Sequence, residues 1–198
     1  MQLPSQLRTD ACQALAGAWQ NWRGDDLVPQ RTQVRIEDIK SWLPNIVVLE
    51  LRSRREVIFR LAGTRIVESL GVELTGRNYL EFSHPEERAT RAERMHQLGQ
   101  WPCGAHIQMS VTFVSGRSVP SEALTLPVRP AGRGQPIQLF AMIMALEDTT
   151  SQWPAADSRH FPTADEGCFV DIGAGAPKLD GWTTATLDPA AATASRAV

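Results

Sequence analysis

The order in which hydrophobic periodicity changes along the first 150 residues constrains the fold of this chain most. Apolar side chains recur at helical spacing from Leu7 to Trp22, and Gly24 follows as a helix stop. A second short helical pattern, residues 36–43, precedes a β-branched and apolar run from Ile46 to Leu51. The pattern therefore predicts two helices before the first strand.

Alternation of period two predicts the other strands. It occurs at residues 57–61, returns at residues 105–114 and 124–128, and is followed by an almost wholly apolar run at residues 137–146. Short helical stripes and a charged helix after His84 occupy the interval between the second and third strands. This order predicts an α+β fold: a five-stranded antiparallel sheet, short helices between strands two and three, and an N-terminal helix.

The 198 residues are expected to form three regions. Residues 1–30 form an N-terminal amphipathic helix, residues 31–149 form the sheet domain, and residues 150–198 form a flexible tail. Alanines and prolines interrupt every regular pattern in the tail, although residues 167–172 could supply a short docking strand. The apolar content of 42% is enough for a buried core.

Charge and cysteine usage exclude several classes of function. Twenty basic and 22 acidic residues give a net charge of −2, so nothing in the composition favours nucleic acid or an anionic membrane. Cys12, Cys103 and Cys168 are odd in number and far apart, which favours a reducing compartment over a disulfide framework. No apolar run reaches the length of a membrane span or signal sequence, so a cytoplasmic location is expected.

Several motifs make the chain similar to a known family. The segments 59–64, 74–82 and 84–88 resemble the part of PAS sensory domains in which a strand leads into short helices and then a longer helix. Trp19-Gln20-Asn21-Trp22-Arg23-Gly24, followed by Ile39, Trp42, Leu43 and Pro44, looks most like a bacterial subgroup of small stand-alone PAS proteins. The resemblance covers roughly residues 14–148.

This resemblance implies a non-enzymatic sensory or interaction module. Because 48 tail residues cannot build a kinase or cyclase, we expect it to act in trans on a signalling protein. Flanking helices of PAS proteins mediate dimerisation, so the stripe of Leu7, Leu15, Trp19 and Trp22 is a candidate homodimer surface. The alternative is that the same stripe covers the sheet of its own chain.

The resemblance also implies a pocket between the sheet and the short helices. The residues expected to line it are Phe59, Leu61, Thr64, Val67, Leu70, Tyr79, Phe82, Met109, Phe113 and Leu124. Most are apolar, so a ligand should be apolar or aromatic, with the Tyr79 hydroxyl or Thr64 as orienting donors. The alternative is that these side chains fill the space at ordinary interior density and leave a ligand-free scaffold.

No cofactor is expected in this pocket. The flavin-binding PAS class has a cysteine motif that does not occur between Thr64 and Phe82. His84 and His96 could be proposed as haem ligands, but they are better explained as a residue preceding a helix and as part of a solvated helix face. No spacing typical of a metal site occurs either, so a colourless protein is expected.

The sequence supports a catalytic function less well than a signalling module. Asp171-Ile172-Gly173-Ala174-Gly175 imitates a nucleotide-binding turn, but the sequence after it does not continue as a helix. The main rival to a signalling module is a small cone-shaped α+β enzyme of the isomerase or dehydratase type, with an Asp or His acid–base pair in its pocket. Such a fold places long helices before its hairpins, whereas here two strands precede the central helices.

Overall fold

Seven strands form one sheet in the computed structural model, which describes residues 7–147 and 159–187. The spatial order is β2-β1-β5-β4-β3-β6-β7, and every neighbouring pair is antiparallel except β6 with β7. The strands are β1 (Ile46–Ser53), β2 (Glu56–Ala62), β3 (Cys103–Thr112), β4 (Ser118–Val128), β5 (Gln138–Ala145), β6 (Ala164–Asp171) and β7 (Thr183–Thr186). The predicted α+β class is confirmed, whereas the predicted number of five strands is wrong.

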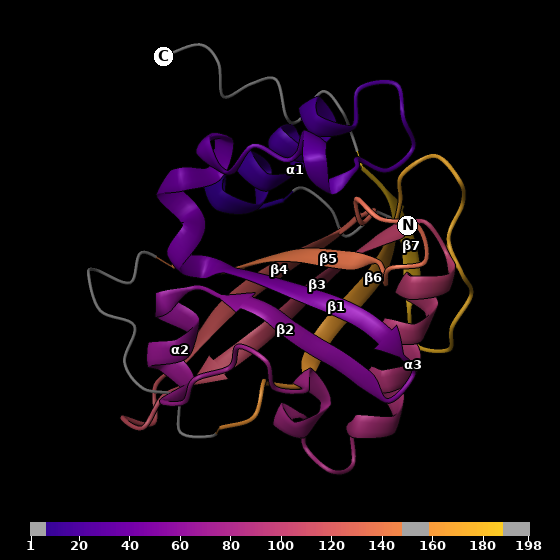
Figure 1. Cartoon of the computed structure of the whole chain (residues 1–198). Coiled ribbons are helices and arrows are strands. Elements are labelled where there is room, and N and C mark those ends of the chain that lie inside the picture. Colours follow the sequence, from indigo (N-terminus) through magenta and orange to yellow (C-terminus); the bar gives the residue numbers. More distant parts are fainter. Residues whose placement is uncertain (1–6, 148–158, 188–198) are drawn as a thin grey trace.

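Helices cover both faces of this sheet (Figure 1). The α-helices are α1 (Asp10–Arg23), α2 (Thr64–Leu70) and α3 (Arg88–Gln100), and the 3-10 helices are η1 (Arg31–Gln33), η2 (Ile36–Asn45) and η3 (Tyr79–Phe82). Helix α1 lies on one side, and α2, η3 and α3 lie on the other. Within residues 7–147 and 159–187, no helix has the length and apolarity needed to cross a membrane.

Helix α1 packs against the sheet of its own chain. The Thr9 side chain accepts a hydrogen bond from the Cys12 amide at the helix start, and Gly24 ends the helix at a φ of 53°. Trp19 is fully buried, and its indole N–H donates to the Pro127 carbonyl over 2.7 Å. Leu15 and Trp22 are buried as well and Leu7 is half-buried, so this stripe mainly covers the sheet of its own chain, and homodimerisation through it stays a prediction.

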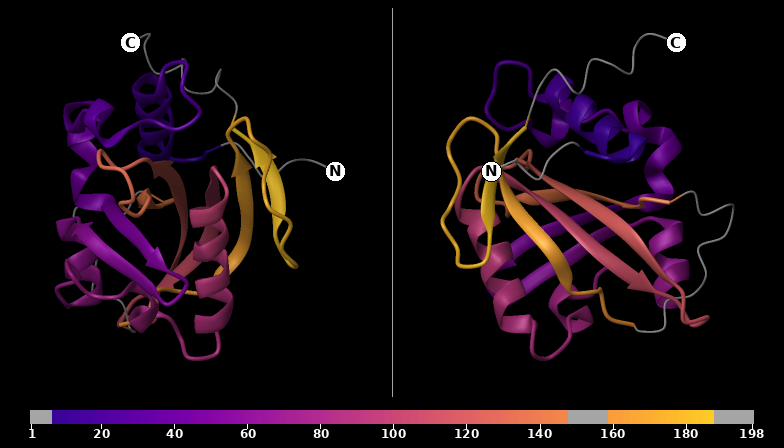
Figure 2. Two further views of the ribbon diagram at one scale, coloured as in Figure 1. Left: turned by 45° about the vertical axis from the view of Figure 1, so that its right-hand side comes forward. Right: turned by 180° about the vertical axis from the view of Figure 1, so that it is seen from behind.

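The two additional strands come from the segment that the sequence assigned to a tail. β6 pairs with β3 along most of its length and buries Phe169 completely, and β7 extends the sheet beyond it (Figure 2). The expectation of an irregular segment is therefore incorrect for residues 164–171 and 183–186, although a docking strand near residues 167–172 was foreseen. Mobility of residues 150–198 in solution stays a prediction, and residues 148–158 and 188–198 lie outside the described chain.

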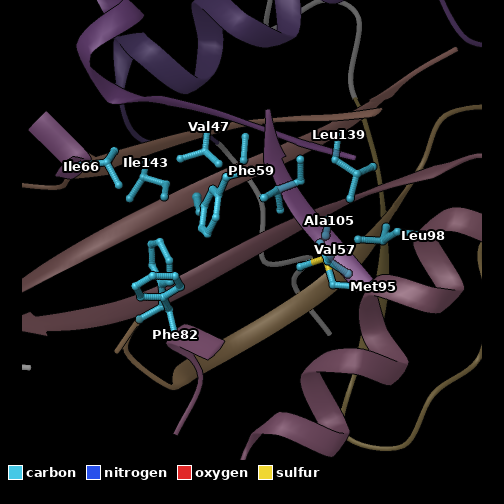
Figure 3. Close-up of a cluster of buried hydrophobic side chains, with 14 of the residues drawn as sticks. Val47, Val57, Phe59, Ile66, Phe82, Met95, Leu98, Ala105, Leu139 and Ile143 are labelled. Atoms are coloured by element: carbon cyan, nitrogen blue, oxygen red, sulfur yellow. The ribbon is translucent and has the colours of Figure 1, made fainter. Parts of the chain in front are cut away.

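The core is divided by the sheet into two main clusters of buried residues. One cluster lies between the sheet and α1 and contains Trp19, Leu124 and Phe140. The other lies between the sheet and α2, η3 and α3, where Phe59 and Met95 meet side chains from several strands (Figure 3). The second cluster encloses the cavities described next.

Candidate functional site

Two neighbouring cavities lie on the side of the sheet that faces α2, η3 and α3. The larger measures about 290 Å³ and the smaller about 70 Å³. They share four lining residues, which are Met109, Ile143, Phe161 and Pro162. These side chains therefore form the boundary between two parts of one candidate site.

The larger cavity lies beside α2. Ile66, Ser69 and Leu70 of α2 line it together with residues 109–112 on β3 and residues 160–163. The His84 ring contacts the His160 ring, with 4.6 Å between their centroids. The polar side chains of this cavity are hydroxyl and imidazole groups, and its remaining lining is mainly apolar.

An aromatic cluster forms one wall of the smaller cavity. The Phe59 ring lies 5.8 Å from the rings of Tyr79 and Phe82 and 6.1 Å from the ring of Phe161, measured between centroids. The Tyr79 and Phe161 rings lie 5.4 Å apart. Edge-to-face and stacked contacts of this kind stabilise a core beyond simple burial, so this wall is well ordered by packing.

Two arginines of α3 complete the smaller cavity. Arg91 is 7% exposed and donates hydrogen bonds to the Tyr79 hydroxyl (3.1 Å) and to the carbonyls of Phe161 and Pro162 (3.2 and 2.9 Å). The Arg94 guanidinium stacks over the Trp182 ring, with its carbon 4.7 Å from the ring centroid. Burial lowers the pKa of Arg94 because the charged form loses hydration.

Some of the residues predicted for the pocket line these cavities. Phe59, Tyr79 and Met109 line the smaller cavity, and Leu70 and Met109 line the larger. Phe82 packs on Phe59 in the same core cluster without lining either cavity. Their positions agree with a pocket between sheet and helices, and ligand binding by them stays a prediction.

Other predicted residues lie elsewhere because the strands place them differently. Leu61 is 44% exposed, since the pairing of Val48 with Leu61 and of Leu49 with Phe59 leaves one extra residue, a bulge that reverses the alternation. Thr64 is exposed as the first residue of α2, with Gly63 at the cap position. Thr64 is therefore not placed to orient a ligand in either cavity.

Three further predicted residues also lie outside the cavity linings. Val67 lies on α2 between Ile66 and Leu70 but is only half-buried and lines neither cavity. Leu124 faces α1 on the opposite side of the sheet, and Phe113 packs in a separate small cluster beyond the end of β3. Because both faces of the sheet are covered, apolar alternation in β4 did not reveal which face was which.

Sequence reasoning missed the residues that give this site its charge. Arg91, Met95 and Leu98 share one helical face at positions i, i+4 and i+7, which was the available signal that Arg91 is buried. The charge pattern of α3 instead suggested a solvated face. Phe161 and Trp182 were missed because they follow residue 150, outside the predicted domain.

A buried ion pair lies on the opposite side of the sheet, under the start of α1. His106 Nε2 is 3.0 Å from Glu122 Oε2, and the Glu122 carboxylate also accepts hydrogen bonds from the Thr9 amide (2.7 Å) and hydroxyl (2.6 Å). Burial alone would raise the pKa of Glu122, but these hydrogen bonds lower it. Burial alone would lower the pKa of His106, but hydrogen bonds to Cys168 and Glu122 raise it. Both groups are therefore charged at neutral pH.

The described residues offer little redox or metal chemistry. Cys12, Cys103 and Cys168 are free and buried, and burial raises the pKa of Cys103 to about 12, with Asp171 as a second cause. Within residues 7–147 and 159–187, no group of three or more His, Cys, Asp or Glu side chains could hold a metal ion. The candidate functional site is the pair of cavities beside Met109, because their walls combine apolar side chains with a few polar groups.

Comparison with known proteins gives one extended match. The family model described as "PAS domain" matches residues 7–144, which is more than half of the chain. No curated protein matches the chain.

Solved structures of several PAS domains are similar to part of the chain. The PAS domain of Bordetella pertussis BvgS is 16% identical, covers 58% of this chain and 88% of its own, and has a TM-score of 0.43. Drosophila melanogaster Cycle PAS-B with bound ethylene glycol is 13% identical, covers 50% of this chain and 97% of its own, and has a TM-score of 0.38. The PAS domain of an HTR-like protein from Haloarcula marismortui is 17% identical over 58% of this chain and 98% of its own, with a TM-score of 0.33.

Proposed function

This chain belongs to the PAS domain family, a family of sensory and signalling modules, and on that premise we propose that it binds a small, mainly apolar ligand in the two cavities beside Met109. We further propose that ligand binding changes how the chain interacts with a partner protein, and that the chain itself catalyses no reaction. The partner is proposed on the signalling role of the family alone.

The larger cavity is the observation that carries this proposal. This space beside α2 measures about 290 Å³ and is partly open, so a small molecule can enter it, which favours a binding site over a filled scaffold. Apolar walls with a few polar groups are typical of small-molecule sites. Residues from α2, β3 and β5 line the cavity, so occupancy changes the packing between helices and sheet.

The lining favours binding over acid–base catalysis. No aspartate or glutamate is among the residues of the described chain that line either cavity. Of the hydroxyl groups at the cavity edge, Ser110 donates to Asp165 over 3.0 Å, and Thr112 pairs with Ser118 over 2.8 Å. The alternative of an enzyme with an Asp–His pair therefore gains no support from this site.

Filling the cavities tests the proposal. We expect 1-octanol to bind the full chain in calorimetric titration and to raise its melting temperature, because a ligand that binds only the folded state stabilises it. Met109→Trp places a larger side chain at the residue that lines both cavities, so binding of 1-octanol should be lost. Ile143→Phe supplies a second, smaller filling at the same boundary.

Leu61→Trp is the matched control, because Leu61 is exposed on β2 and lines neither cavity. This variant should bind 1-octanol like the parent chain. Circular dichroism of each unliganded variant checks that it is folded. Absence of any 1-octanol binding to the parent chain, or unchanged binding to folded Met109→Trp, would contradict the proposal.

A further inference from the structure

The smaller cavity contains a buried positive charge that no carboxylate of the described chain neutralises. Arg91 is 7% exposed, and its three hydrogen-bond partners are a hydroxyl and two backbone carbonyls, all uncharged. The guanidinium group of arginine is a permanent cation in proteins. Burying a charge is costly unless an opposite charge lies close to it.

Arg94 adds a second positive charge at the same cavity, one helical turn further along α3. Its Nε atom is buried and has no hydrogen-bond partner among the described residues. The guanidinium carbon lies over the Trp182 ring, 4.7 Å from its centroid, a contact that uses none of the N–H donors. The pKa of Arg94 is influenced by Glu87 and Arg91, but no ion pair joins Arg94 to a carboxylate in the residues that the structure describes.

The shape of the site indicates what would satisfy these donors. Arginine recognises planar anions, above all carboxylates, through paired hydrogen bonds. The smaller cavity measures only about 70 Å³, which suits a carboxylate head group, and it adjoins the apolar cavity of about 290 Å³ across Met109 and Phe161. An anion with an apolar body matches both volumes.

We propose that the ligand is a small organic acid whose carboxylate lies against Arg94 and Arg91 and whose apolar body extends past Met109 into the larger cavity. This inference rests on the proposed ligand-binding function and specifies the chemistry of the ligand. Arg94 donates the direct hydrogen bonds through its guanidinium group, whose buried Nε has no partner among the described residues. Arg91, already bonded to Tyr79 and residues 161–162, contributes its charge and holds the cavity wall in place.

Matched probes that differ only in the head group test this inference. Octanoate and 1-octanol are titrated separately into the full chain at neutral pH, and the dissociation constants are compared. We expect octanoate to bind at least tenfold more tightly, because charge-assisted hydrogen bonds contribute more than neutral ones. Equal affinities, or a preference for 1-octanol, would overturn the carboxylate assignment while leaving the proposed apolar site intact.

Variants on one helix assign the charge to Arg94. Arg94→Met keeps an unbranched apolar side chain, and the Arg94 Nε has no hydrogen-bond partner among the described residues, so we expect the variant to fold and to lose the preference for octanoate while still binding 1-octanol. Arg88→Met removes an exposed arginine from the same helix and should leave both affinities unchanged. If Arg94→Met kept the full preference for octanoate, the assignment to Arg94 would be wrong. If neither probe bound the parent chain, the proposed function itself would fail.

Discussion

At the scale of single residues, Gly63 lies in close contact with the backbone of η2 at the start of α2. A Cβ atom at this position would lie 2.3 Å from the Pro44 carbonyl oxygen and 2.4 Å from that of Leu43. The Gly63 amide also donates to the Ile46 carbonyl over 2.8 Å. The glycine is therefore required by the close approach of η2, because its own φ of −66° is ordinary for any residue.

Gly63→Ala should consequently destabilise the domain. We expect a loss of about 1–3 kcal/mol in the free energy of unfolding, the usual cost of overpacking, because backbone atoms cannot move aside as a flexible side chain does. Urea denaturation measures the change. Thr64→Ala, at the exposed neighbouring position, is the control and should change stability by less than about 0.5 kcal/mol. Equal stability of the Gly63→Ala variant would show that η2 can shift.

At the scale of elements, the ion pair of His106 and Glu122 connects α1 to the sheet. His106 lies on β3 and Glu122 on β4, and the carboxylate accepts hydrogen bonds from the backbone amides of Arg8 and Thr9 at the start of α1. A negative charge at a helix N-terminus is also favoured by the helix dipole. We therefore expect this pair to set how firmly α1 holds the sheet.

Stability should decline on both sides of neutral pH because of this pair. The pKa of His106 is raised above 6.5, so its contribution to the free energy of unfolding is complete below pH 6.5 and is lost progressively as the pH rises. The pKa of Glu122 is lowered below 4.5, so its contribution is complete above pH 4.5 and is lost as the pH falls. Urea denaturation of the parent chain from about pH 3 to about pH 10 measures the acid and the alkaline decline in the free energy of unfolding, because this range spans the titration of Glu and His.

Removing one partner of the ion pair should lower the free energy of unfolding more than a change of pH does. His106→Gln leaves the buried Glu122 charge without its cationic partner, at a cost of about 3–5 kcal/mol near pH 6, and should flatten the alkaline limb. His96→Gln on α3 is the control and should keep the alkaline decline in stability, because α3 lies on the side of the sheet opposite to α1 and the ion pair. An alkaline limb that persists in folded His106→Gln would assign it to another group.

At the scale of the whole molecule, residues 159–187 close the side of the sheet that carries the cavities. Phe161 and Trp182 line the smaller cavity, and Phe169 of β6 is fully buried beside Trp182, with ring centroids 4.8 Å apart. The sequence-based hypothesis of a flexible tail and the observed strand pairing thus predict different behaviour in solution. This difference can be measured directly.

Amide exchange of the full chain distinguishes the two predictions. We expect β6 amides that bond to β3 to be protected to nearly the same degree as those of β3 with β4, because both pairs belong to one sheet. The exposed turn at residues 115–117 serves as the internal reference for rapid exchange. Exchange of β6 at the rate of that turn would restore the tail hypothesis and place the domain boundary near residue 149.

The amino-acid sequence by itself determined the order of helices and strands up to β5 and the resemblance to a family, because these depend on local periodicity and motifs. Whether the Leu15 and Trp19 stripe covers the sheet of its own chain was decided only by the tertiary structure. Only the tertiary structure decided that Leu61 faces outward, since one extra residue in the pairing reverses every later side chain. Tertiary contacts likewise brought Arg91 and Arg94 to a cavity wall whose other side comes from Phe161 and Trp182, some 70 to 90 residues later in the chain. A helix of alternating charges gives no local indication that two of its cations face such a wall, because burial depends on what distant segments cover.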